Sequence, residues 1–296
     1  MTVQPPLQSY PPSWQLDPWN PQQLRWWDGS QWSPKLATLD GRPILSPETT
    51  GQEPATPDRV WFPTLAPLQF PAFLLGLATM LTLLVLNVVA SSAGQSMLGA
   101  GLGILTLAFS VLGFVGAGVF ASQKWGTKRF IDDFGYRIKW FDLPLGFGGA
   151  IGLFISTILI GLLTQLIGLP EGSNLEGIQE QIADDPRVKG ILFAMMFVLA
   201  GLLAPLTEEL LFRGVIFRGL LSKMKPAVAV VIQGFIFGAA HYTPDQGWGN
   251  VALLLTLSVV GMGLGLITWA TGRLWPAIFA HAVFNCTSLT LLYFSL

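Results

Sequence analysis

The sequence predicts an all-α polytopic membrane protein, a bundle of seven to eight transmembrane helices, preceded by a small N-terminal β-hairpin module rich in Trp and Pro. Hydrophobic residues make up 51% of the chain and charged residues 11%, whereas a typical soluble domain carries about 25% charged residues. Apolar runs of about 20 residues, the length that spans a bilayer, recur from residue 68 onward. An Asp28-Gly29 pair between aromatic flanks indicates the hairpin.

The chain divides into three predicted regions. Residues 1–39 form the hairpin module, in which tryptophans pack on prolines and on each other. Residues 40–67 are rich in Pro, Thr and Glu, a composition typical of a flexible linker. Residues 68–296 form the bundle. The first 60 residues lack a basic segment leading into an apolar one. We therefore expect no signal peptide, and we expect the transmembrane helices to drive insertion.

Seven apolar segments account for the bundle. The fourth continues through charged residues to about residue 221, too long for one straight crossing. Gly201 and Pro205 offer a break or a kink there, so the count is seven or eight. The predicted segments are 68–89, 97–121, 143–167, 188–206, 227–241, 251–270 and 276–296.

Charge in the loops predicts the orientation, because short cytoplasmic loops carry an excess of Lys and Arg. The loop after the third segment carries five acidic residues between 171 and 185, and its basic residues lie only near its end. The N-terminal module is therefore predicted to be cytoplasmic, in a cell membrane. The loop after the second segment carries Lys124, Lys128, Arg129, Arg137 and Lys139.

Composition also limits the partners. The net charge is −1 and no basic stripe is present, so we expect no nucleic-acid partner and a lipid bilayer as the surroundings. Cys286 is the one cysteine of the sequence and cannot form an intrachain disulfide.

The fourth segment carries ionisable residues that are costly in hydrocarbon. Glu209 and Arg213 are spaced i,i+4, so they can pair on a helix. Glu208 points about 100° away from Glu209 and does not share Arg213 by spacing, so it is available for a separate role. The alternative is a helix end at the membrane surface, with all three side chains solvated.

Both histidines of the sequence lie in apolar segments. His241 follows Phe237 among small residues, and His281 and Asn285 share one helical stripe at i,i+4. Alternatively, these residues serve as interfacial or helix-packing groups. On straight antiparallel helices His241 matches the depth of Glu208, whereas His281 lies about 14 Å nearer the cytoplasmic face. That gap closes only if the hairpin projects into the cytosol or the helices tilt strongly.

Together these patterns resemble the CPBP family of intramembrane proteases, which includes CAAX-processing endopeptidases and bacteriocin-processing or immunity proteins (the Abi family). The resemblance covers about residues 130–296, and the stretch from Phe134 to Leu143 is similar to the family's entry segment. The N-terminal module resembles one that is common in actinobacterial membrane proteins. The family pattern is matched, in order, by Glu208-Glu209 with Arg213, Phe237 with His241, and His281 with Asn285.

The resemblance implies an intramembrane endopeptidase that hydrolyses a peptide bond of a membrane-associated protein or peptide. Glu208 would be the general base that activates water, with His241 beside it. His281 and Asn285 would bind a metal or stabilise the oxyanion. Because bacteria are not expected to prenylate proteins widely, a prenylated CAAX tail is not the expected native substrate. Supporting roles are implied for Glu209, Arg213 and Phe237.

The resemblance leaves the metal open. Zn²⁺ held by Glu208, His241 and His281 would be a sufficient catalytic set. Glu209 would then be the remaining base, although Arg213 competes for it.

Two other classes of function are compatible with the sequence. One is a non-catalytic bacteriocin-immunity or membrane scaffold protein, in which the motifs serve the fold. The other is a proton-coupled transporter that uses Glu208 and the histidines as a relay, although the sequence shows no inverted repeat.

Overall fold

The computed structural model describes residues 12–18, 20–29, 31–44, 68–93, 97–172 and 186–295. The chain separates into two compact units, Met1–Pro63 and Thr64–Leu296. The predicted linker from residue 45 onward and most of the acidic loop, residues 173–185, lie outside the described residues.

The first unit contains an antiparallel sheet in the order β1-β2-β3-β4. The hairpin predicted at Asp28-Gly29 is confirmed. Gly29 has φ +100°, and the Asp28 carboxylate accepts the Gln31 N–H at 2.7 Å. Trp27, 2% exposed, and Trp32 pair across the turn with ring centroids 5.1 Å apart. The sheet is larger than a hairpin, and its strands are β1 (Ser13–Asp17), β2 (Asn20–Trp27), β3 (Trp32–Thr38) and β4 (Pro43–Ile44).

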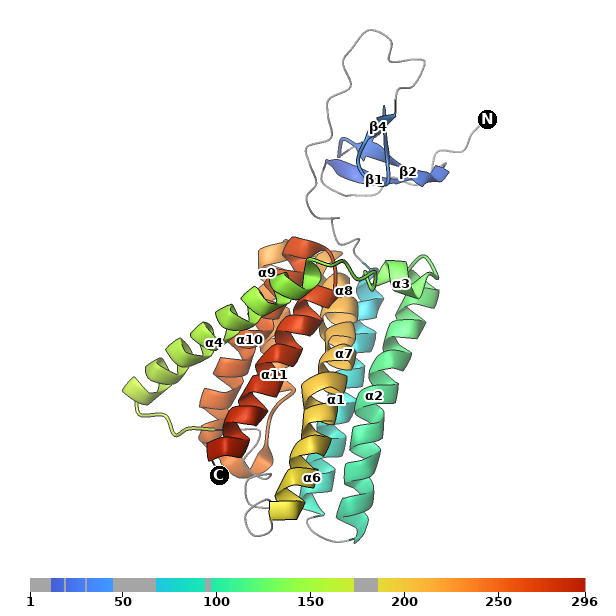
Figure 1. The fold of residues 1–296 in the computed structure, drawn as a ribbon. Coiled ribbons are helices and arrows are strands. Elements are labelled where there is room, and N and C mark those ends of the chain that lie inside the picture. The colour runs from blue at the N-terminus through green and yellow to red at the C-terminus, as the bar shows by residue number, and fades with distance from the viewer. Residues whose placement is uncertain are drawn as a thin grey trace. The chain divides into compact units, whose positions relative to one another are not determined.

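The second unit is helical (Figure 1). Among the described residues, six helices are long and apolar enough to cross a membrane. The helix Pro226–Ala239 has 14 residues, about 21 Å, which is shorter than the bilayer core. The helices are α1 (Phe70–Ser92), α2 (Met97–Trp125), α3 (Phe130–Asp133), α4 (Asp142–Leu166), α6 (Pro186–Met196), α7 (Ala204–Glu209), α8 (Arg218–Leu221), α9 (Pro226–Ala239), α10 (Gly249–Thr271) and α11 (Trp275–Ser295).

The fourth predicted segment is one continuous helix from α6 to α8. It does not break at Gly201 or Pro205. Instead it contains two π-helical stretches, η2 (Phe197–Leu203) and η3 (Leu210–Phe217), which lie on either side of α7. Such wide turns occur often at functional sites, and here they flank the two adjacent glutamates.

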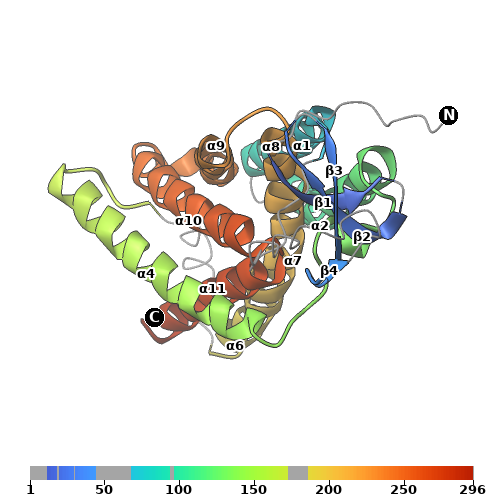
Figure 2. The same cartoon turned by 90° about the horizontal axis from the view of Figure 1, so that it is seen from above.

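This continuous helix is the centre of the unit. Seen from above, it lies between the α1/α2 pair and the group α4, α10 and α11 (Figure 2), and it packs on members of both groups. The side chains of η3 are all buried, and Phe212, Ile216 and Phe217 belong to the main apolar core. Polar groups on this helix are therefore held inside protein rather than in lipid.

Candidate functional site

The pair predicted from the i,i+4 spacing is present and fully buried. Arg213 Nη1 lies 2.9 Å from Glu209 Oε1, and both side chains are 0% exposed. Arg213 also donates to the Gly261 carbonyl of α10 at 3.0 Å. Its guanidinium lies 4.4 Å from the centroid of the Phe237 ring, a cation–π contact that is stronger away from water. The cation is thereby fixed by three separate helices.

Glu209 has a second partner that the spacing on its own helix does not indicate. His281 Nδ1 of α11 lies 2.8 Å from the same Oε1 atom, and His281 is 4% exposed. The estimate made along straight helices is therefore wrong for His281. Figure 1 shows why, because α4, α10 and α11 slant strongly against the column of α6 to α8.

Glu208 faces the other nitrogen of the same imidazole. His281 Nε2 and Glu208 Oε2 are 4.0 Å apart, and the Glu208 side chain is 21% exposed. A carboxylate only accepts hydrogen bonds, so the contact with Glu209 places the proton of neutral His281 on Nδ1. Glu208 and His281 thus present two acceptors across a gap too long for a direct hydrogen bond. Two acceptors cannot bond to each other, so a donor such as water is needed to connect them.

His241 lies in the turn after α9 and is bound to the last part of that helix. Its Nδ1 donates to the Phe237 carbonyl at 2.8 Å, which leaves Nε2 unprotonated in the neutral ring. The Phe237 ring contacts both imidazoles, with centroid distances of 4.7 Å to His241 and 5.7 Å to His281. The two histidines therefore contact the same Phe237 ring, and Glu208 faces His281.

Asn285 satisfies a carbonyl that the π-helical stretch leaves free. The Ala204 N–H donates to the Leu199 carbonyl, and Pro205 has no N–H to offer. The Ala200 carbonyl instead accepts the Asn285 amide N–H at 2.8 Å. One of the two N–H groups of the Asn285 amide is therefore bound to the helix that carries the glutamates.

Two further residues, which the sequence motifs did not include, hydrogen-bond to backbone carbonyls beside the site residues. Gln233 of α9 is 0% exposed and donates to the Gly261 carbonyl at 2.8 Å, beside Arg213. In the sequence, Gln233 can be recognised as a single amide in an apolar segment, four residues before Phe237. Tyr136 donates its hydroxyl to the Leu206 carbonyl at 3.3 Å, and its signal was its place in the family-like entry segment.

The three predicted zinc ligands do not form one ligand group. Each histidine has a free Nε2 and an Nδ1 contact of the kind that orients metal-bound imidazoles. However, in the part of the chain that the structure describes, no three His, Cys, Asp or Glu side chains are grouped so that they could hold a metal ion. Zinc binding by these residues stays a prediction.

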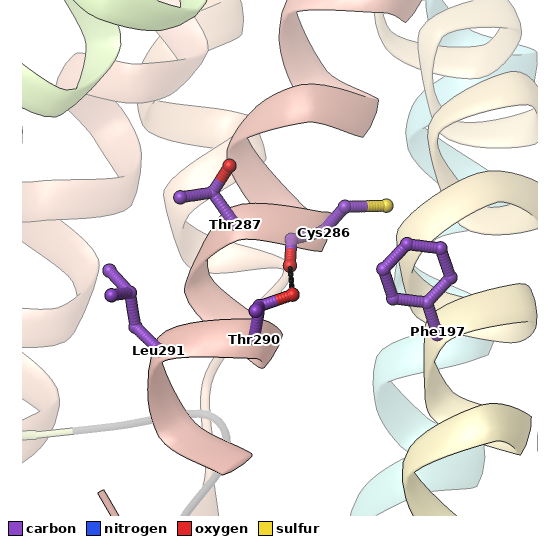
Figure 3. A pocket seen from close by; sticks show the side chains of 5 residues that line it. All are labelled: Phe197, Cys286, Thr287, Thr290 and Leu291. Atoms are coloured by element: carbon purple, nitrogen blue, oxygen red, sulfur yellow. Dashed lines mark hydrogen bonds between the residues drawn. The ribbon is translucent and has the colours of Figure 1, made fainter. Parts of the chain in front are cut away.

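A shallow hollow of about 220 Å³ lies farther along α11 (Figure 3). Its lining begins one residue after Asn285, at Cys286, and faces Phe197 of η2. The Thr290 hydroxyl, at its edge, donates to the Cys286 carbonyl at 2.7 Å. Glu208 and the histidines do not line this hollow, so it is separate from the site.

Comparison with known families agrees with the motifs. Residues 190–287 match the family model described as "Type II CAAX prenyl endopeptidase Rce1-like", and this range contains every residue of the three motifs. The resemblance to the CAAX-protease family is confirmed over this range, which is narrower than the predicted 130–296. Residues 12–55 match a family of proteins of unknown function, DUF2510.

Two relatives show the same pattern of partial similarity. The chain is 26% identical over 142 residues to the Bacillus subtilis (strain 168) protein named "Putative membrane peptidase YdiL", which covers 46% of this chain and 55% of that protein. It is 25% identical over 158 residues to an uncharacterized protein of Mycoplasma capricolum, which covers 52% of this chain and 45% of that protein. The chain thus spans about half the length of the curated relatives it matches. No solved structure matches it.

Proposed function

We propose that the helical unit is an intramembrane endopeptidase that hydrolyses a peptide bond of a membrane-associated protein or peptide. The observation that carries the proposal is the partly exposed Glu208 carboxylate facing the imidazole of His281, which Glu209 orients. The match of residues 190–287 to a prenyl endopeptidase family supports the same class of reaction.

The two acceptors, the Glu208 carboxylate and Nε2 of His281, can hold and activate a water molecule for hydrolysis. A water molecule held between Glu208 and Nε2 of His281 gives a proton to Glu208, and its oxygen attacks the carbonyl carbon of the peptide bond. The carbonyl oxygen takes up the negative charge. The C–N bond then breaks, and the amide nitrogen leaves with the proton that Glu208 received. The products are a carboxylic acid and an amine, and Glu208 is again a carboxylate.

The other residues hold this arrangement. Glu209 fixes the ring orientation and tautomer of His281, in the way that a carboxylate orients a catalytic histidine. Arg213 neutralises Glu209 and anchors it to α10. One N–H of the Asn285 amide holds the helix at the Ala200 carbonyl, which leaves its second N–H as a donor for the oxyanion.

Mass spectrometry of protein N-termini tests the proposal. Membranes of cells that express the wild type, Glu208→Gln or Glu171→Gln are compared. We expect new N-termini with the wild type and with Glu171→Gln, which carries the same chemical change at an exposed residue outside the site. Glu208→Gln should lower their abundance by about 100-fold or more, the usual effect of losing a general base.

The same experiment addresses the scaffold alternative. If Glu208→Gln, at normal protein levels, yields the same N-termini and the same phenotype as the wild type, the enzyme proposal is wrong. The motifs then serve the fold of an immunity or scaffold protein.

Metal analysis of the purified protein tests the zinc prediction. One zinc ion per chain, lost in His281→Ala, would support the ligand set Glu208, His241 and His281. An active preparation without stoichiometric metal after chelation would contradict it.

A further inference from the structure

Tyr136 connects the two helices that carry the candidate site. It lies on the segment between α3 and α4. Its hydroxyl donates to the Leu206 carbonyl of α7 at 3.3 Å, two residues before Glu208. Its own carbonyl accepts the indole N–H of Trp275 at 2.8 Å. Trp275 opens α11 and lies about 9 Å along that helix from His281.

The segment around Tyr136 is fixed at both ends. Gly135 has φ +62°, and a Cβ at this position would lie 3.0 Å from the Gly272 carbonyl oxygen, so the chain passes directly over the turn before α11. Farther along, Asp142 pairs with Arg273 of the same turn, and both side chains are almost fully buried. The backbone that carries the Tyr136 ring is therefore held in place on both sides of this residue.

Its surroundings keep the phenol protonated. Burial raises the pKa of Tyr136 well above its ordinary value, and the negative charge of Glu209 raises it further. The ring stacks on Phe130 with centroids 5.6 Å apart and meets Trp275 edge-on at 6.1 Å. The hydroxyl therefore remains a hydrogen-bond donor even near pH 10, where an ordinary tyrosine begins to ionise.

We propose that Tyr136 is a positioning residue of the site, which holds the helix of Glu208 in register with the helix of His281. Because Tyr136 touches neither side chain in the described contacts, it acts through Leu206 and Trp275. The kinetic part of this claim rests on the proposed peptidase function, whereas the structural part does not.

Tyr136→Phe removes the hydroxyl and keeps the ring. Losing one neutral hydrogen bond should lower kcat by about three- to tenfold and leave KM within about twofold. Cleavage of a membrane substrate identified from the N-terminal comparison is the assay, and the full-length protein in liposomes is used. Tyr293→Phe, near the C-terminal end of α11 and outside the site, carries the same chemical change and is the control, which should leave kcat unchanged.

A second measurement does not need activity. Diethyl pyrocarbonate modifies histidines, and this chain has two, which mass spectrometry resolves. We expect Tyr136→Phe to raise the modification rate of His281 by about threefold or more through local opening. The rate of His241, which its own helix holds, should not change.

A double-mutant cycle connects the two ends of the bridge. If Tyr136 and Trp275 act through one connection, then Tyr136→Phe combined with Trp275→Phe lowers kcat by less than the product of the single effects. Equal His281 modification and equal kcat in Tyr136→Phe and wild type overturn the proposal, as does an equal rise at both histidines. If the wild-type protein cleaves no membrane substrate, the peptidase function is wrong, and the ratio of His281 to His241 modification still decides the role of Tyr136.

Discussion

Two adjacent glutamates of one helix have different surroundings. Glu209 is 0% exposed and has two ionisable partners on Oε1, Arg213 and His281, whereas Glu208 is partly exposed and faces His281 across 4.0 Å. The helical spacing predicted the split between paired and free carboxylates. It could not predict that His281 is shared between them, because that depends on how α11 crosses the helix.

Because the two glutamates have different surroundings, replacing each of them should change the free energy of unfolding by a different amount. Glu209→Gln leaves the buried cation of Arg213 without its counter-charge, a change that costs about 3–5 kcal/mol. Glu208→Gln keeps the shape of a partly exposed side chain and should cost about 1 kcal/mol or less. Thermal unfolding in detergent measures both variants. Equal melting temperatures for the two would contradict the assignment of Glu209 as the buried partner of Arg213.

Tyr136 gives the protein a defined response to alkaline pH. Its pKa is raised in the folded state by burial and by Glu209, so the unfolded chain loses this proton first, from about pH 10. The contribution to stability is complete below about pH 10 and is lost as the pH rises further. The melting temperature of the wild type should therefore fall more steeply above pH 10 than that of Tyr136→Phe. Parallel slopes would refute this.

At the scale of elements, the apolar runs predicted the helices well. The third, sixth and seventh predicted segments match α4, α10 and α11 within two residues at either end. The π-helical stretches around Glu208 could not be predicted, because they depend on partners from other elements. Asn285 takes the carbonyl at Ala200, and Tyr136 takes the one at Leu206.

Close contact between α9 and α10 supports the buried network. A Cβ at Gly261 would lie 2.9 Å from the Cβ of Phe237 and 3.0 Å from the Cα of Gly234. The Gly261 carbonyl also accepts hydrogen bonds from Arg213 and Gln233. Moving α9 away from α10 would therefore disturb the hydrogen bonds that Arg213 and Gln233 donate to the Gly261 carbonyl.

Gly261→Ala should accordingly destabilise the protein by about 1–3 kcal/mol, because overpacking outweighs the better helix propensity of Ala. Gly152→Ala in α4 is the matched control, since a Cβ there meets nothing within 4 Å, and it should be neutral or stabilising. Thermal unfolding and peptidase activity are measured for both variants. If Gly261→Ala is as stable and as active as Gly152→Ala, the close contact does not matter.

At the scale of the whole unit, contacts between chain-distant segments define two opposite ends of the bundle. At one end the Leu68 N–H donates to the Arg218 carbonyl at 3.1 Å, and Asp142 pairs with Arg273. At the other end, a Cβ at Gly249 would lie 2.8 Å from the carbonyl oxygen of Glu171. The start of α10 is thus at the same end as the residues that follow α4, so the short helix α9 and residues 240–248 together connect the two ends.

The charge of these two ends predicts the orientation. The end with Arg218 also includes the basic loop between α2 and α4, whereas the end with Glu171 continues into the acidic loop. We therefore expect the basic end to be cytoplasmic. Single cysteines test this in a Cys286→Ala background, which has no other thiol. In intact cells an impermeant maleimide should label Glu171→Cys and Trp248→Cys, which replace exposed residues at the acidic end. It should label Lys139→Cys only after lysis. The reverse pattern would invert the topology, and protection of Trp248→Cys alone would show that the start of α10 does not reach the outer surface.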